Sequence, residues 1–255
     1  MSRLPMAAGE ALKEWPPTMP LLILMNDTYS HPGAVSGFDV QSRATFVSRT
    51  YGHLVGAILT FTLIEVYLFK TGLAETIARG LLGVSWLLVL GGFVVVSWLA
   101  SRAAHLAQSR AAQYAALAAY VVAQAIIFVP LLYIANKVAP GVISSAATVT
   151  FFAFSGLTAV VFLTRKDFSF LRGILCWSGI IALVLIAAGV IFGFNLGTYF
   201  SVAMVALAGA SILYDTSNVL HHYPEDRYVA AALELFSSVA LMLWYVLRLF
   251  LSSRR

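Results

Sequence analysis

The stretch "YVAAALELFSSVALMLWYVLRLF", residues 228–250, is apolar almost throughout, and only Glu234 and Arg248 interrupt it with charge. About 20 such residues cross the hydrocarbon core of a bilayer as a helix, so this run is long enough to span. The whole chain has the same character, because 60% of its 255 residues are hydrophobic and 11% are charged, against about 25% charged in soluble domains. With a mean hydropathy of +0.88, this composition predicts an integral membrane protein surrounded by a lipid bilayer.

Apolar runs of similar length follow one another from residue 50, separated by segments rich in charge, proline or glycine. Each run is continuously apolar rather than alternating at period two, which argues against a β-barrel. The sequence therefore predicts an all-α, polytopic bundle of seven transmembrane helices. The predicted spans are residues 50–69, 80–101, 113–135, 142–164, 172–193, 197–220 and 228–251.

The ionisable residues limit the classes of function. The net charge is +5, but the basic residues are spread through loops, so we predict no nucleic-acid partner. No lysine lies within a predicted span, which excludes a retinal Schiff base, and the chain has neither a phosphate-binding glycine loop nor a His-Glu-x-x-His zinc motif. The single cysteine, Cys176, cannot form an intrachain disulfide, and we expect it to be buried.

The amino-terminal region differs from the rest. Residues 1–44 are broken by prolines and hold one short apolar patch, "MPLLILM", which is too short for a signal-peptide core. We therefore predict a disordered or poorly ordered tail over residues 1–44 and a seven-helix membrane domain over 45–255. Met25 is an alternative start of the native protein, because "MNDTYSHPG" would be a plausible beginning for a cytoplasmic arm; intact-mass measurement of the native protein tests this.

The distribution of lysine and arginine predicts the orientation. Placing the amino end in the cytoplasm gives the inner segments eight basic residues near the spans and the outer loops before the last span three, as the positive-inside rule favours. The inner residues are Arg43, Arg49, Arg102, Arg110, Arg165, Lys166, Arg172 and Arg227, and the outer residues are Lys70, Arg79 and Lys137. Arg248, Arg254 and Arg255 favour an inner carboxyl end, which would require the last segment to enter without crossing. Because that segment is long enough, we expect a full crossing, in a plasma or inner membrane.

Acidic residues inside spans are the main candidates for function, since each costs about 2.5–3.5 kcal/mol on insertion scales. Asp215 and Glu234 each lie about nine residues from the middle of "HHYPED", so a helical hairpin places them at similar depth, where they could face each other. Two close carboxyls at low dielectric cannot both ionise and would share a proton, which makes a pH sensor. Alternatively, each acid bonds a neighbouring group, with Ser211, Thr216 and Ser217 near Asp215.

Three further ionisable residues are weaker candidates. Glu65 lies five residues before Lys70 near the outer end of its span, and we expect its side chain to reach the headgroups. His221 and His222 lie at the mouth of the last hairpin and titrate near neutral pH if unperturbed. They are candidate secondary pH sensors, although loop histidines are more often only solvated.

Four motifs in this order resemble the Bax inhibitor family, the transmembrane Bax inhibitor motif proteins. They are "SRTYGHL" at 48–54, "TRKDFSFL" at 164–171, "YDTSNV" at 214–219, and "YVAAALELF" followed by "YVLRLF" in the last span. The resemblance covers about residues 45–251 and implies a bundle whose last helix is surrounded by the other six. It also implies a pH-sensitive calcium leak, in which Asp215 matches one half of a di-aspartyl pair that holds the pore closed.

The chain departs from the family pattern at the second half of that pair. Aligning the last span places Ser238 where the resemblance implies the partner aspartate. Glu234 lies one helical turn earlier and could restore the pair. Alternatively, Ser238 donates a hydrogen bond to Asp215, which favours the charged carboxylate rather than a shared proton.

The sequence thus predicts a passive cation pathway, for Ca²⁺, gated by protonation around Asp215, with no cofactor beyond weak Ca²⁺ binding at Asp215. So few oxygen ligands predict weak binding and leak. Two alternatives stay open: a non-conducting membrane scaffold for partner proteins, and a proton-coupled carrier. An enzyme is not expected, because Tyr214 and Asp215 resemble one motif of intramembrane aspartyl proteases but the second, Gly-x-Gly-Asp, is missing from the final span.

Overall fold

The computed structural model describes residues 32–107 and 109–253, which are helical for most of their length and contain no strand. Eight helices follow one another in these ranges. They are α2 (Pro32–Lys70), α3 (Leu73–Leu82), α4 (Trp86–Leu106), α5 (Arg110–Val138), α6 (Val142–Thr164), α7 (Leu171–Phe192), α8 (Gly197–His221) and α9 (Tyr228–Ser252).

Seven of these helices are long and apolar enough to cross a membrane, which confirms the all-α, seven-span prediction for the described part of the chain. The exception is α3, a short helix of ten residues that packs against α5 through Ala74 and Ala78. The predicted second span, 80–101, is therefore wrong at its start, because the backbone breaks at Gly83–Ser85 and α4 begins only at Trp86. The sequence "LLGVSWLL" is apolar across this break, so hydropathy does not reveal it.

At the amino end, α2 begins at Pro32. Residues 32–44 are therefore helical where the sequence predicted a poorly ordered tail, while residues 1–31, including the proposed start at Met25, lie outside the described residues. Residues 45–255 form one compact unit, and the site lies within it.

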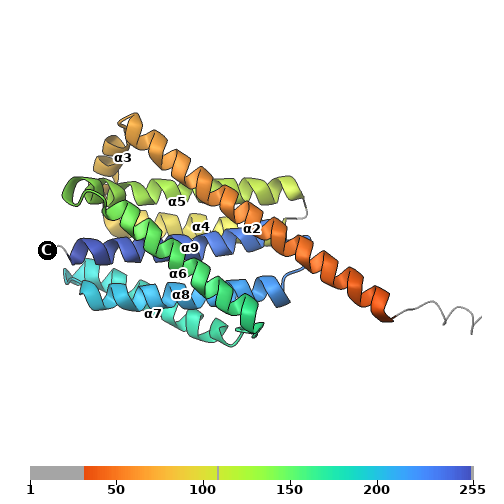
Figure 1. Ribbon diagram of the computed structural model, residues 1–255. Helices are drawn as coiled ribbons and strands as arrows, with labels where there is room; N and C mark the ends of the chain where they lie inside the picture. Colours follow the sequence, from red (N-terminus) through yellow and green to blue (C-terminus); the bar gives the residue numbers. More distant parts are fainter. Residues whose placement is uncertain (1–31, 108, 254–255) are drawn as a thin grey trace, which may run out of the picture. The chain divides into compact units, whose positions relative to one another are not determined.

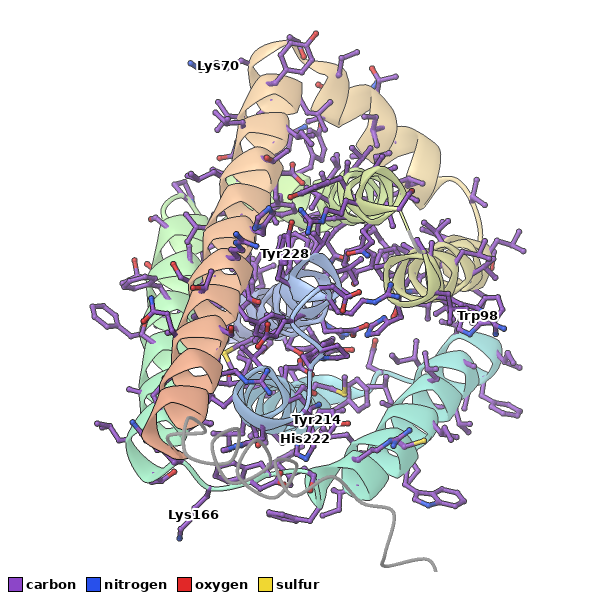
Figure 2. All side chains as sticks on the ribbon, turned by 90° about the vertical axis from the view of Figure 1, so that its right-hand side faces the viewer. Lys70, Trp98, Lys166, Tyr214, His222 and Tyr228 are labelled. Atoms are coloured by element: carbon purple, nitrogen blue, oxygen red, sulfur yellow. The ribbon has the colours of Figure 1, made fainter. Side chains whose placement is uncertain are left out.

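Helix α9 occupies the centre of this unit (Figure 1). It packs directly against α4, α5, α6 and α8, and the rings of Phe61 on α2 and Phe236 on α9 lie 6.1 Å apart. Figure 2, a view along the bundle, shows Tyr228 at the start of α9 near the middle of the helices. The predicted central position of the last helix is thus confirmed, while α7 lies outside, against α8 and α4.

Small residues allow the helices to approach closely at this centre. A Cβ at Gly209 on α8 would lie 3.4 Å from Cδ1 of Leu157 on α6 and 3.7 Å from Cε of Met242 on α9. The neighbouring Ala208 is fully buried. Close approach of this kind replaces the hydrophobic driving force that helices lack in lipid.

The outer helix α7 carries large apolar side chains on the surface of the bundle, such as Trp177 and Phe192. Cys176 is exposed on the same helix, so its expected burial is wrong. A span in a bilayer is apolar on its lipid-facing side too, so an apolar run does not tell which of its residues face the protein.

Candidate functional site

The carboxylate of Asp215 is held between α8 and the central helix α9. Ser238 Oγ on α9 donates a hydrogen bond of 2.5 Å to Asp215 Oδ2. Ser238 is 7% exposed, so the bond lies inside the bundle. Of the two arrangements left open by the sequence, the structure contains the serine donor, and a serine at this position satisfies a carboxylate without adding a second acid.

Glu234 on α9 forms its contacts with α4, not with α8. Ser101 Oγ on α4 donates a hydrogen bond of 2.5 Å to Glu234 Oε1, and His105 Nδ1 lies 3.8 Å from the same oxygen. The side chains of His105 and Glu234 are each about one-third exposed. Glu234 therefore does not replace the missing aspartate as the hydrogen-bond partner of Asp215, although it lies one helical turn before Ser238 on α9. Its longer side chain leaves the face that Ser238 presents to α8 and reaches α4.

A span predicted to end at residue 101 leaves His105 outside the membrane helix, so the sequence does not indicate that this residue reaches Glu234. In the structure α4 continues to Leu106, and Ser101 and His105 are one helical turn apart on the face toward α9. His105 Nδ1 donates to the Ser101 carbonyl at 2.9 Å. The i, i+4 spacing of a serine and a histidine near a span end was the available signal.

The 222–227 segment between α8 and α9 is tied to this network. His105 Nε2 and the Tyr223 hydroxyl lie 3.2 Å apart, and Arg227 Nη1 donates to the Ala107 carbonyl at 2.7 Å. Burial raises the pKa of Tyr223 well above its ordinary value of 10, so this hydroxyl keeps its proton at physiological pH. The end of α4 and the start of α9 are therefore fixed to each other through His105 and Arg227.

A second cluster joins the segment after α6 to α8. Asp167 Oδ1 accepts from the Ser169 backbone N–H at 2.8 Å and from Ser217 Oγ at 3.4 Å, and Ser217 Oγ accepts from the Phe168 N–H at 2.9 Å. His222 Nε2 lies 3.3 Å from Asp167 Oδ2. The Ser169 N–H, with smaller contributions from both neighbouring histidines, holds the pKa of Asp167 below its ordinary value.

The predicted secondary sensors belong to this cluster rather than to the acids of α8 and α9. His222 pairs with Asp167, while His221 makes a ring contact with His222 at 6.2 Å between centroids. Figure 2 shows Tyr214 on α8 and His222 directly after this helix, at the same side of the bundle as Lys166. Neither histidine lies in the Asp215 or the Glu234 hydrogen bond, and their pH-sensing role stays a prediction.

A third network joins α2, α5 and α9. His53 Nε2 lies 3.0 Å from the Tyr114 hydroxyl, which lies 3.2 Å from the Tyr228 hydroxyl. His53 Nδ1 donates to the Arg49 carbonyl at 2.6 Å, which leaves Nε2 as the acceptor in the neutral ring. The motif at 48–54 thus supplies a polar contact to the first residue of the central helix.

Glu65 is not at the headgroups. Its side chain is 7% exposed, and neither carboxylate oxygen has a hydrogen-bond partner among the described residues. The expected outward reach is therefore wrong, because the helical face that carries Glu65 also carries Phe61 and Leu68, both buried. Proximity to Lys70 along the chain did not indicate this orientation.

None of these clusters is a metal cage. Within residues 32–107 and 109–253, no group of three or more histidine, cysteine, aspartate or glutamate side chains is placed to hold a metal ion. Asp215 offers one carboxylate and a neighbouring hydroxyl to an ion, which fits at most a weak Ca²⁺ contact.

Residues of the motifs at 164–171 and 214–219 contact each other and the last span in the structure. Ser217 of "YDTSNV" contacts Asp167 of "TRKDFSFL", and Asp215 of the same motif contacts the last span. The profile of the family described as "Inhibitor of apoptosis-promoting Bax1" matches residues 43–255, which is most of the chain. The chain belongs to the Bax inhibitor-1 family.

Part of the chain is also similar in sequence to a curated bacterial protein. An uncharacterized protein of Pseudomonas aeruginosa is 34% identical over 110 residues, which are 43% of this chain and 49% of that protein. The chain thus spans about half the length of this relative. The similarity supports the relationship and carries no statement of activity.

Proposed function

We propose that this Bax inhibitor-1 family protein is a pH-sensitive, passive cation leak for Ca²⁺, closed by the contact between Asp215 and Ser238. The observation that carries the proposal is the 2.5 Å hydrogen bond between these residues, because it joins α8 to the helix that all but one of the other spans contact. A change at this bond acts on the packing of the central helix.

The gate uses the charge of Asp215. A hydrogen bond to an ionised carboxylate is about twice as strong as one between neutral groups, so proton uptake weakens the Ser238 contact. Loss of this bond lets α8 and α9 separate at this level, because the small residues Ala208 and Gly209 line the interface and the hydrogen bond from Thr198 to Ser252, at 3.4 Å, lies at the other end of the two helices. Protons are therefore the signal and Ca²⁺ the transported ion.

The passive character follows from the ligands. A pump or a tight Ca²⁺ site needs six to eight oxygens, whereas a leak needs only weak and transient contacts. Asp215, Ser238 and backbone carbonyls of an opened interface supply such contacts. In this function the chain has no catalytic role, and it lies in a plasma or inner membrane with its amino end in the cytoplasm.

A non-conducting scaffold is the second candidate, and one observation favours it. Both intramembrane acids of the last hairpin already have a hydroxyl donor at 2.5 Å, as groups with a purely structural role would. In that case Asp215 only holds α8 to α9.

Calcium influx into liposomes that hold the purified protein, measured from pH 5 to 8, separates the two. The leak predicts protein-dependent influx that rises as the pH falls, whereas protein-free liposomes show none. If the folded protein conducts no Ca²⁺ at any pH in this range, the leak is rejected and the scaffold takes its place.

A further inference from the structure

A cavity separates the outer helix α7 from the centre of the bundle. Its volume is about 490 Å³, and it lies among α4, α5, α7 and α9, with residues 194–196 at its rim. Ligand cavities in proteins range over roughly 300–1,000 Å³, so this one is large enough for a ligand. The outer helix α7 packs on α8 and α4.

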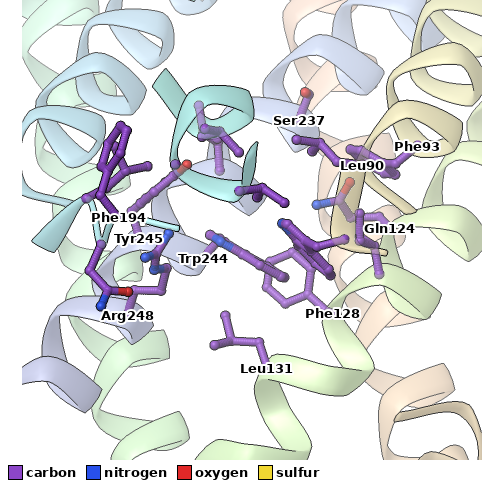
Figure 3. Close-up of a pocket in the computed structure, with 18 of the residues that line it drawn as sticks. Leu90, Phe93, Gln124, Phe128, Leu131, Phe194, Ser237, Trp244, Tyr245 and Arg248 are labelled. Atoms are coloured by element: carbon purple, nitrogen blue, oxygen red, sulfur yellow. The ribbon is translucent and has the colours of Figure 1, made fainter. Parts of the chain in front are cut away.

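The body of the cavity is aromatic and aliphatic. Trp244 on α9 stacks on Trp86 of α4 with ring centroids 6.0 Å apart and meets Phe128 of α5 edge-on at 5.0 Å. Leu90 and Leu131 complete this wall (Figure 3). Such a surface matches an apolar chain and offers nothing to a hydrated cation.

The two ends of the cavity are polar and differ from each other. Arg248 lies at one end and Gln124 with Ser237 at the other (Figure 3). Arg248 faces the ring of Tyr245 at 5.8 Å, and among the described residues no carboxylate lies within ion-pair distance of it. Because a guanidinium is always charged, this end attracts an anion.

Gln124, at the other end of the cavity, has a side-chain oxygen that no described residue satisfies. Gln124 is 6% exposed, and its Oε1 has no hydrogen-bond partner among the residues that the structure describes. Buried amides in native proteins are nearly always hydrogen-bonded, so this end of the cavity suits a water molecule beside the ligand.

The charge of the lining argues against a cation route through this cavity. No aspartate or glutamate is among its lining residues, while Arg248 is. A cation would meet a fixed positive charge and no oxygen ligand stronger than an amide or hydroxyl. The cavity is thus distinct from the Asp215–Ser238 contact on the α8 side of α9.

We propose that this cavity holds one acyl chain of an anionic phospholipid whose phosphate pairs with Arg248. Arg248 lies four residues before the end of α9, about 6 Å along the helix, so its long side chain can reach a headgroup at the end of this span. From Arg248 to Ser237 the cavity extends 11 residues along α9, about 16 Å, enough for much of an acyl chain. The bound lipid wedges α7 away from α9.

Photo-crosslinking tests the assignment. The full-length protein is reconstituted in phosphatidylcholine vesicles with a trace of phosphatidylglycerol that carries a diazirine on its acyl chain, and the labelled residues are mapped by mass spectrometry. We expect labels on the lining residues of α5 and α9, and at least a fivefold loss with Arg248→Gln. The control Arg165→Gln, which removes a cation after α6, should leave the labelling unchanged.

A second variant keeps the test valid if Arg248→Gln folds poorly. Leu131→Trp fills the cavity and should reduce labelling several-fold, whereas Val138→Trp on the exposed side of α5 should not. Equal labelling by a phosphatidylcholine probe, labels confined to the outer surface, or labelling that neither Arg248→Gln nor Leu131→Trp reduces would overturn the proposal. So would an Arg248→Gln protein that changes Ca²⁺ influx but not labelling, because the cavity would then belong to the ion pathway.

Discussion

On its α8 side the central helix donates a hydroxyl, Ser238, to a carboxylate, whereas on its α4 side it presents a carboxylate, Glu234, to a hydroxyl and a histidine. The α8 contact has no basic partner in its hydrogen bond, while in the α4 contact the imidazole of His105 lies 3.8 Å from the carboxylate. Two acids of one hairpin therefore differ in what a proton does to them. On the α8 side protonation removes the only charge, and on the α4 side a proton added to His105 strengthens the contact.

Removing the two carboxylates one at a time gives the largest contrast. Asp215→Asn should abolish the pH dependence of Ca²⁺ influx, because the amide cannot change charge. Glu234→Gln should leave most of that dependence. Influx from pH 5 to 8 measures both, and Asp226→Asn, an exposed acid of the 222–227 segment, is the matched control. The reverse ranking would move the sensor to the α4 side.

The adjacent residues Ser237 and Ser238 of α9 allow the free energies of their two hydrogen bonds to be compared. Ser238→Ala removes the donor to Asp215 and should lower the free energy of unfolding by about 1–2 kcal/mol. Ser237→Ala removes an acceptor of the Tyr120 hydroxyl at 2.8 Å and should cost about 0.5 kcal/mol. Denaturant unfolding in detergent micelles compares them. Equal losses would mean that the Asp215 contact has no special strength.

Glu65 is a buried carboxyl whose oxygens have no hydrogen-bond partner within residues 32–107 and 109–253. Replacing it by leucine removes two unpartnered buried oxygens and should stabilise the protein by about 1 kcal/mol, opposite in sign to the loss at Ser238. Thermal unfolding of Glu65→Leu beside the wild type measures the change. A loss of stability would show that Glu65 has a partner in the folded protein, such as an ordered water.

The α4 contact should be weaker, since it is one-third exposed and its ion pair is long. A double-mutant cycle with His105→Ala and Glu234→Ala should give a coupling energy of about 0.3–1 kcal/mol that increases as the pH is lowered, because a protonated imidazole attracts the carboxylate. Unfolding midpoints of the four proteins supply the cycle. Coupling that grows with pH would contradict a charged histidine in this contact.

The smallest effect is expected outside the membrane, at Asp167. Because its pKa in the folded protein lies below the ordinary 3.8, the carboxylate adds stability above that value and loses it as the pH falls through the folded pKa. Asp167→Asn should therefore lower Tm near pH 7, and the difference should close in acid. A difference that stays constant down to the lowest pH would assign the loss to packing.

The seven spans could be predicted because an apolar run of sufficient length has few alternatives to a membrane helix. The rotation of each helix about its axis could not be predicted, and this rotation determines which side chains meet in the candidate site. Glu234 and Ser238 share a face by spacing, yet the longer side chain reaches α4 and the shorter one α8. Hydropathy likewise did not distinguish the inward face of Glu65 from an outward one, and it ended the second span before His105.

Infrared difference spectroscopy of the protein in liposomes, stepped between pH 8 and pH 5, tests the central claim most directly. The leak gated by Asp215 predicts a protonated-carboxyl band that is absent in Asp215→Asn and whose midpoint coincides with the midpoint of Ca²⁺ influx. A band that persists in Asp215→Asn, or a midpoint separated from that of influx by more than one pH unit, would contradict it.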